Sequence, residues 1–293
     1  MTSMRLTTKF NLVLIPVLAL GLAAVGWVSY DILRKNARQE IVERAGMMME
    51  GALAVRGYTV SEIRPLLNLQ MKRAFLPQSV PAYAATQTFE KLRETHPEYS
   101  YKEATLNPTN PRNRAVDWEH DIITLFRDFP DRTEVVGERD TPTGRSLYLA
   151  RPIRIQKSGC LVCHSTVDAA PQTMLARYGS ANGFGWQMDE VVGAQVVSIP
   201  MSVPIRLANE AFTTFMLAVG GVFVAIVILL NIMLRAIVIR PVTRMSQLAD
   251  QISHGDLGGA EFKQSGNDEI AVLGASFNRM RRSLDKAFKM LDE

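Results

Sequence analysis

The sequence contains few cysteines and no concentration of basic charge. Only two cysteines occur in 293 residues, which excludes a disulfide-stabilised scaffold. The net charge is +4, and its excess is spread along the chain without a lysine- or arginine-rich run. A protein that binds nucleic acid gathers such residues in a stripe or patch, so we expect no nucleic-acid partner. A hydrophobic content of 47% also excludes a largely disordered chain.

Long apolar runs are present instead, over residues 10–30 and 211–234, and neither contains a charged residue. Each run reaches the roughly 20 helical residues that cross a bilayer. A cleaved signal peptide is the alternative for the first run. That run ends in Trp27-Val28-Ser29-Tyr30 rather than in small residues, so it predicts an uncleaved anchor with an interfacial aromatic flank.

The short flanks of the two runs predict the orientation. Arg5 and Lys9 precede the first run, and Arg235, Arg240 and Arg244 follow the second. Basic flanks favour the cytoplasmic side, which predicts a two-pass protein of the bacterial inner membrane with both termini in the cytoplasm. The expected parts are a cytoplasmic N-terminus (1–9), a first span (10–30), a periplasmic domain (31–210), a second span (211–234) and a cytoplasmic module (235–293).

The cytoplasmic module carries an apolar pattern typical of paired helices. Apolar residues recur with a period near 3.5 over 241–252 and again over 270–291, which predicts a coiled coil. The connector between them contains four glycines and begins a new helix at Asp268-Glu269. This order resembles the HAMP signal-relay module, through Arg240-Pro241 and the stretches 252–257, 268–273 and 277–280. The resemblance implies a parallel four-helix bundle formed by two subunits, and so a homodimer. Helices lying on the membrane surface are the alternative, but these helices alternate acidic and basic residues.

Both cysteines lie in one motif, Cys160-Leu161-Val162-Cys163-His164. The spacing Cys-X-X-Cys-His is the attachment signature of c-type haem: two thiols bind the two vinyl groups, and the histidine is the proximal iron ligand. We therefore expect covalent haem c, with iron bound by His164. A redox disulfide, a zinc site completed by His96 and His120, and a coincidental pair are the alternatives.

Residues 45–204 resemble a family of exported c-type haem domains long described as a domain of unknown function with a PAS-like fold. The shared stretches are 101–104, 107–111, 117–119, 150–152, 160–164, 178–179, 182–186 and 193–200. The resemblance implies haem binding and an α+β fold with an antiparallel sheet. The sequence agrees with it: residues 146–155 and 193–200 are typical of strands, and Ile41, Ala45, Met48, Ala52 and Val55 predict that the first span continues as a long helix.

The second axial ligand of the iron stays open at this point. No third cysteine exists, so a distal thiolate is excluded. We favour a methionine among Met47, Met48 and Met49, with His120 as runner-up; His96, Met188 or an open site also remain. The alternative is a structural role, in which these methionines fill the core or a dimer contact. Arg145, Arg151 and Arg154 are candidate partners of the haem propionates, or simply surface charges. Gly183, Gly185 and Trp186 predict a tight turn that presents an aromatic ring.

A haem domain between two spans, followed by a relay, predicts a sensor of redox state or of a diatomic gas. A membrane-anchored electron carrier is the second hypothesis, and it leaves the two heptad helices without a purpose. We expect no enzyme activity, since no distal acid–base set typical of a peroxidase is visible. Either a separate cytoplasmic output protein reads the relay, or this chain is a fragment of a longer one.

Overall fold

The computed structural model describes residues 4–142, 144–256, 261–262 and 266–291. The chain divides into two compact units. One contains Met1–Tyr30 with Phe212–Glu293, and the other contains Asp31–Ala211. The division falls at the ends of the two apolar runs. Each unit is described by itself below.

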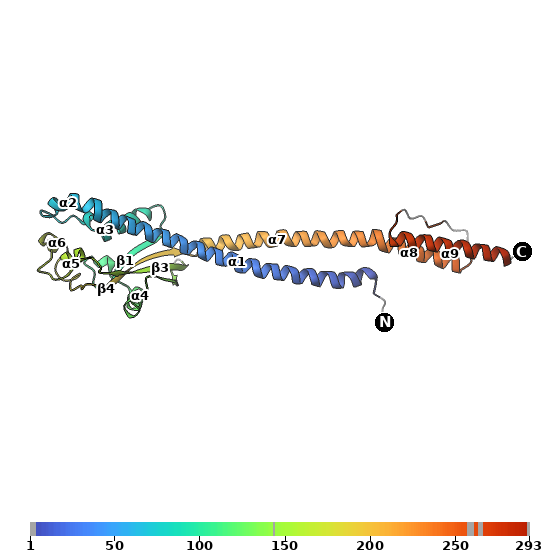
Figure 1. Cartoon of the computed structure of the whole chain (residues 1–293), viewed down its shortest axis with the longest axis horizontal. Coiled ribbons are helices and arrows are strands. Elements are labelled where there is room, and N and C mark those ends of the chain that lie inside the picture. Colours follow the sequence, from blue (N-terminus) through green and yellow to red (C-terminus); the bar gives the residue numbers. More distant parts are fainter. Residues whose placement is uncertain (1–3, 143, 257–260, 263–265, 292–293) are drawn as a thin grey trace. The chain divides into compact units, whose positions relative to one another are not determined.

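The first helix, α1, is continuous from Leu6 to Tyr58 (Figure 1). It contains the first apolar run and continues beyond it, as the sequence predicted. Ile41, Ala45, Met49 and Ala52 are fully buried on one face, because steps of three and four residues return to the same side of a helix. Met48 and Val55, also predicted on this face, are partly buried against the same core. Met49, beside Met48, is the methionine at the centre of the face, since four-residue steps from Ile41 lead to it.

Beyond Tyr58 the helix widens into a π-helical turn, η1 (Thr59–Ile63), before α2 (Arg64–Met71). Pro65 lies in the first turn of α2. A proline there has no N–H to donate to the preceding turn, so the local hydrogen-bond pattern must change. A 3-10 turn, η2 (Pro77–Ser79), and helix α3 (Pro81–Leu92) follow, and each also begins with a proline.

A four-stranded antiparallel sheet forms the centre of the Asp31–Ala211 unit. Its strands are β1 (Ser100–Thr105), β2 (Val135–Thr141), β3 (Gly144–Arg154) and β4 (Val191–Pro200). The spatial order is β1-β4-β3-β2. The elements between the strands are η3 (Pro111–Asn113), α4 (Asp117–Asp128), α5 (Ser158–His164) and α6 (Gln172–Tyr178). The two strands expected from the sequence are β3 and β4, and the mixed helix-and-sheet class is confirmed.

Helices pack against both faces of the sheet, which gives two hydrophobic cores. One face packs against α1 and α3, with Met49, Phe89, Leu149 and Val197 among the buried side chains. The other packs against α4, through Ile123 and Phe126 among others. The alternation of a strand sends neighbouring side chains to opposite faces, so β4 serves both cores. Because β4 is an interior strand, its first seven residues are all buried.

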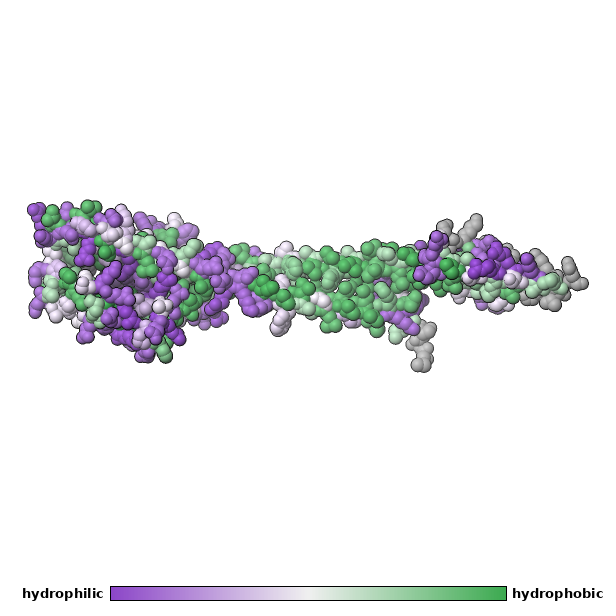
Figure 2. Space-filling view, viewed as in Figure 1, coloured by the Kyte–Doolittle hydropathy of each residue, from purple (hydrophilic) through white to green (hydrophobic). Residues whose placement is uncertain are grey.

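The remaining helical elements of the described chain are α7 (Ser202–Met233), the π-helical turn η4 (Leu234–Ile239), α8 (Arg240–Ser253) and α9 (Glu269–Leu291). Helix α7 begins in the Asp31–Ala211 unit, and from Phe212 onward the chain belongs to the other unit. The two long helical segments, Leu6–Met71 and Ser202–Ser253, each contain a window long and apolar enough to cross a membrane. Apolar side chains cover the surface of the membrane-length stretch of these helices, and hydrophilic residues flank it (Figure 2). Reciprocal hydrogen bonds between the amides of Asn11 and Asn231, at 2.8 and 2.9 Å, join α1 to α7.

Phe262, in the connector between α8 and α9, contributes to the packing of these two helices. Phe262 is buried against Met245 of α8 and Gly274 of α9. The side chain of Asn278 accepts from the Phe262 N–H at 3.1 Å and donates to its carbonyl oxygen at 2.9 Å. The two helices expected from the heptad pattern are present as α8 and α9. Leu257 of the predicted connector and the side chain of Leu291 lie outside the described residues.

Candidate functional site

Both cysteines and the adjacent histidine lie on the short helix α5. Only three residues separate α5 from the end of β3, so the sheet fixes where the helix begins. The i, i+3 spacing puts Cys160 and Cys163 on one side of the helix. Both are free thiols of intermediate exposure. Burial raises the pKa of the Cys163 thiol, and the positive charge of Arg64 opposes that rise.

His164, at the end of α5, is fixed by two contacts. Its Nδ1 atom lies 2.7 Å from the carbonyl oxygen of Gly183. A carbonyl can only accept, so Nδ1 carries the proton and Nε2 keeps a free lone pair. The imidazole also stacks on Trp186, with ring centroids 4.0 Å apart and an interplanar angle of 16°. Burial lowers the pKa of His164, and the hydrogen bond to the Gly183 carbonyl opposes that shift. The lowered pKa favours the neutral ring, which is the form able to bind a metal through Nε2.

The loop that holds His164 is built from glycines. Gly183 and Gly185 have φ values of 88° and 83°, a backbone region that favours glycine. This conformation lets Gly185 N–H donate to the Ser165 carbonyl at 2.7 Å and Trp186 N–H donate to the His164 carbonyl at 3.1 Å. The tight turn expected from these glycines is therefore present, and it presents Trp186 to the imidazole.

A second loop, 107–111, holds the first. The side chain of Asn107 accepts from Gly183 N–H at 3.2 Å and donates to the Phe184 carbonyl at 3.4 Å. A Cβ at Gly183 would overlap Thr109, so this contact also requires glycine. The Thr109 hydroxyl is buried without a hydrogen-bond partner in the described part of the chain. Residues 107–111 are indicated in the sequence only by the family resemblance. Their role is not visible there, because Asn107 lies 76 residues from Gly183.

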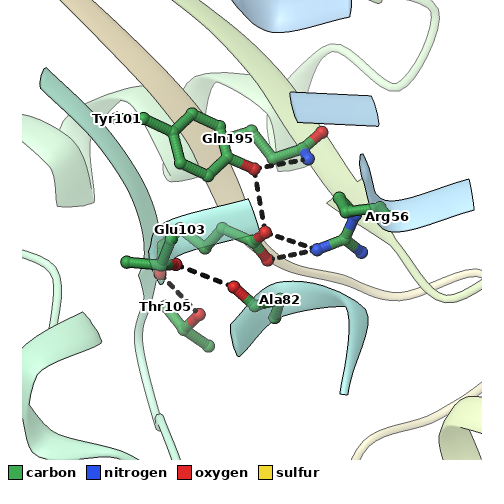
Figure 3. Close-up of polar contacts among 7 residues, drawn as sticks. Arg56, Ala82, Tyr101, Glu103, Thr105 and Gln195 are labelled. Carbon is green, nitrogen blue, oxygen red and sulfur yellow. Dashed lines mark hydrogen bonds and ion pairs between the residues drawn. The ribbon is translucent and has the colours of Figure 1, made fainter. Parts of the chain in front are cut away.

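A buried polar network lies near the end of α1 (Figure 3), and its Arg56 is close enough to Cys160 for the two charges to interact. Arg56 donates to both carboxylate oxygens of Glu103 at 2.5 Å. The Tyr101 hydroxyl donates to Glu103 at 2.8 Å and accepts from the Gln195 amide at 3.0 Å. Burial opposes the charge on Arg56, but Glu103 outweighs it and raises the pKa of the guanidinium; the nearby Cys160 adds to this. Burial and the Glu103 charge raise the pKa of Tyr101 far above its usual range.

The three arginines predicted near the cofactor have other partners. Arg145 and Arg151 pair with carboxylates, and Arg154 bonds to backbone carbonyls. The contacts are Arg145 with Glu138 at 3.0 Å, Arg151 with Glu50 at 2.6 Å and Glu134 at 2.9 Å, and Arg154 with the carbonyl oxygens of Pro130 at 2.9 Å and Asp189 at 3.1 Å. Arg56 and Arg64, which the sequence analysis did not single out, are the arginines whose charge reaches the cysteines.

The candidates for a second axial ligand are scattered. Met49 is fully buried in the core between α1 and the sheet, Met48 is partly buried beside it, and Met47 is 71% exposed. His120 is exposed on α4, with its ring nitrogen 3.5 Å from the Thr124 hydroxyl. His96 and Met188 are also exposed. In the described residues, these side chains have no hydrogen bond or ring contact to His164.

The chain has an antiparallel sheet flanked by helices, followed by an apolar helix and a pair of heptad helices. The sheet carries a helix with the Cys-X-X-Cys-His motif. This combination defines a class of chain in which a sensor domain is joined to a relay, and comparison with protein families identifies the families concerned. The Tll0287-like family model matches residues 34–200, more than half of the chain, and the HAMP domain model matches residues 233–286. The chain belongs to the Tll0287-like family and carries a HAMP domain, which confirms both resemblances inferred from the sequence.

One solved structure is similar to this chain, described as "Crystal structure of the cyanobacterial heme-protein Tll0287". It is 16% identical, with a TM-score of 0.43, and the match covers 55% of this chain and 95% of that one. No curated protein matches.

Proposed function

We propose that this protein is a membrane-bound haem sensor, in which the Asp31–Ala211 unit binds haem and the HAMP domain relays its state. The family membership and the HAMP domain support the coarse statement that the chain is a haem-based signal transducer. The observation that carries the finer proposal is His164, whose Nδ1 proton is held by Gly183 at 2.7 Å. A neutral imidazole with a free Nε2, one residue after a Cys-X-X-Cys pair, suits the axial ligation of a covalently bound haem.

The residues fit the cofactor chemically. Cys160 and Cys163 would each add an S–H bond across a vinyl group, forming two thioethers without any net oxidation. His164 would supply Nε2 to the iron while Gly183 holds the opposite nitrogen of its ring. The buried, partnerless Thr109 hydroxyl beside the loop is consistent with a site built for a further group. Bound haem would supply a one-electron couple and a centre for diatomic gases.

The fold offers two routes from this site to the rest of the chain. The loop 183–186, bonded to His164, continues directly into β4 (Val191–Pro200), and β4 is followed by α7. Arg56, whose charge reaches Cys160, lies on α1. A two-state relay needs an input that acts differently on its two states. A change in charge or ligation at the iron would act on α7 through β4 and on α1 through Arg56.

The membrane arrangement belongs to the same proposal. Residues 10–30 and 211–234 would cross the inner membrane, with residues 31–210 in the periplasm, where c-type haem is attached, and both termini in the cytoplasm. The HAMP helices would pair with those of a second copy to form a homodimer. A separate cytoplasmic protein would read the state of the bundle.

The proposal is tested by producing the full chain with a c-type maturation system and recording spectra of the ferric and ferrous forms, with and without NO and CO. Haem that survives denaturing electrophoresis, and is lost when Cys160 and Cys163 are both replaced by alanine, supports covalent attachment. A matched Ser158→Ala variant on α5 should keep the haem. A spectrum that changes with NO or CO supports gas sensing. Absence of haem from the wild-type chain contradicts the proposal.

A further inference from the structure

A polar groove crosses one end of the sheet, from β1 to β2, in the Asp31–Ala211 unit. Its volume is about 410 Å³, and its lining includes residues of α3, η3, α4 and all four strands. Helix α4 covers only part of its face of the sheet, over Ala150 and Val196. The groove occupies the remaining part, where β1 and β3 begin and β4 ends. The Cys-X-X-Cys-His helix follows the other end of β3, so the groove is separate from the candidate haem site.

Three serine hydroxyls form the floor of this groove. Ser100 and Ser198 are opposite one another in the β1–β4 register, and Ser146 is opposite Pro200, two residues along β4. Cross-strand partners and residues two apart share a face, so all three lie on the same side. Ser146 is only 6% exposed, yet its hydroxyl has no hydrogen-bond partner within the described ranges, and neither do those of Ser100 and Ser198. These hydroxyls line the groove, so each is free to donate to or accept from a bound molecule or water.

The groove also holds more cationic than anionic groups. Its charged lining is Arg93, Lys102, Arg112 and Arg139 against Glu90, Glu98 and Glu119. Lys102 pairs with Glu119 at 2.6 Å, and Arg112 pairs with Glu90 at 3.1 Å. Arg139 lies over the Trp118 ring, with its guanidinium carbon 4.1 Å from the centroid, and has no ion pair with any described residue. Stacking on tryptophan fixes the plane of the guanidinium while leaving its N–H groups able to donate.

We propose that this groove is a second ligand site, which binds a small hydroxylated carboxylic acid. The Arg139 guanidinium donates to the carboxylate, since planar guanidinium and carboxylate groups match in a bidentate pair. Ser100, Ser146 and Ser198 bond the hydroxyl or second carboxyl group. An apolar acid offers no hydrogen-bonding partner to these hydroxyls, so the floor favours hydroxylated acids over apolar ones.

The groove lies beside the end of β4, the strand that leads into α7. A ligand bonded to Ser198 would therefore contact the same strand that receives the His164 loop at its other end. Ligand binding in the groove would therefore act on β4 as a second signal. This proposal does not depend on whether haem is bound at α5.

The test is calorimetric titration of the purified full chain with malate and citrate, with benzoate as the apolar acid and sulfate as the simple anion. We expect malate or citrate to bind more tightly than benzoate and sulfate. Arg139→Gln should weaken binding by about tenfold or more, the effect of losing a charge-assisted pair. Ser146→Ala changes only a hydroxyl and should weaken it by about threefold or more. Arg132→Gln is the matched control, since Arg132 also stacks on an aromatic ring, Phe129, but does not line the groove.

Unchanged binding in Arg132→Gln together with the two losses would support the site. Failure of both hydroxy acids to bind would overturn it, as would sulfate binding as tightly as malate, or affinities of Arg139→Gln and Ser146→Ala equal to that of the wild type. If Arg139→Gln does not fold, the Ser146→Ala variant decides, because it removes a single oxygen.

Discussion

The Nδ1 atom of His164 donates to the carbonyl oxygen of Gly183 over 2.7 Å. This contact joins the last residue of α5 to a loop 19 residues further along the chain. It determines which nitrogen of the imidazole is free, and so which atom is able to bind iron. The loop owes its shape to two glycines and one asparagine, and these residues give the first two predictions.

Gly183→Ala should destabilise the protein more than Gly185→Ala. Both glycines have positive φ, so each substitution carries a similar backbone penalty, but only at Gly183 would the new Cβ overlap Thr109. We expect an additional loss of about 1–3 kcal/mol in the free energy of unfolding for Gly183→Ala. Thermal unfolding of the full chain in detergent, followed by circular dichroism, measures the difference. Equal stability of the two variants would show that the overlap is relieved at no cost.

Asn107→Ala should loosen the loop that bears Gly183. The variant removes two hydrogen bonds to the loop backbone, which is expected to cost about 1 kcal/mol. Hydrogen exchange measured by mass spectrometry should rise over residues 182–186. Asn110→Ala is the matched control, since its side chain caps a 3-10 turn by accepting from Arg112 N–H; it should leave exchange over 182–186 unchanged. A rise in both variants would refute a specific role for Asn107.

Arg56→Met should be strongly destabilising, because it leaves the buried carboxylate of Glu103 without its charge partner. Loss of one member of a buried pair costs about 3 kcal/mol or more, and replacing both members by apolar residues recovers much of that. The double variant Arg56→Met/Glu103→Leu should therefore be more stable than Arg56→Met alone. Arg44→Met, in an exposed pair with Glu40 on the same helix, should change stability by less than about 1 kcal/mol. Chemical denaturation of the wild type and the three variants measures these differences. A double variant no more stable than Arg56→Met would argue against the pairing of Arg56 with Glu103.

The paired amides of Asn11 and Asn231 should stabilise the contact between α1 and α7. Asn231→Leu leaves the Asn11 amide facing an apolar neighbour, and we expect a loss of about 1 kcal/mol. The double variant Asn11→Leu/Asn231→Leu removes both amides and should recover part of that loss. Unfolding by SDS in bicelles provides the measurement. Identical behaviour of the single and double variants would mean that the two amides do not act as a pair.

The sequence predicted the features that depend on neighbouring residues. The Cys-X-X-Cys-His spacing, the apolar runs and the heptad pattern are all local, and the apolar runs and the heptad pattern lie on helices as expected. The resemblance supplied the antiparallel sheet, which periodicity alone does not. The predicted apolar face of α1 packs against the sheet, with Met48 partly buried and Met49 fully buried in the same core; hydrophobicity alone does not show which of two adjacent methionines is more deeply buried.

What the sequence could not predict depends on contacts between distant segments. Asn107 reaches Gly183 across 76 residues, and Arg151 reaches Glu50 across 101. Nothing in the local pattern around Arg151 indicates a carboxylate on α1, so the expected role at the propionates rested on proximity along the chain alone. The unpaired Ser146 hydroxyl is likewise visible only after the strands are aligned in the sheet.

The most direct test of the central claim, that the haem domain signals through HAMP, is cross-linking between copies of the full chain in nanodiscs. Ala275→Cys, at an exposed position of α9, supplies the only reactive thiol when Cys160 and Cys163 both hold haem. A bifunctional maleimide then reports the proximity of the two α9 helices without itself changing the redox state. The account predicts that the cross-linking rate changes when the haem is reduced or binds NO, and that it stays constant in a haem-free control with Cys160 and Cys163 replaced by alanine. The same rate in every haem state would contradict the account and leave a membrane-anchored electron carrier.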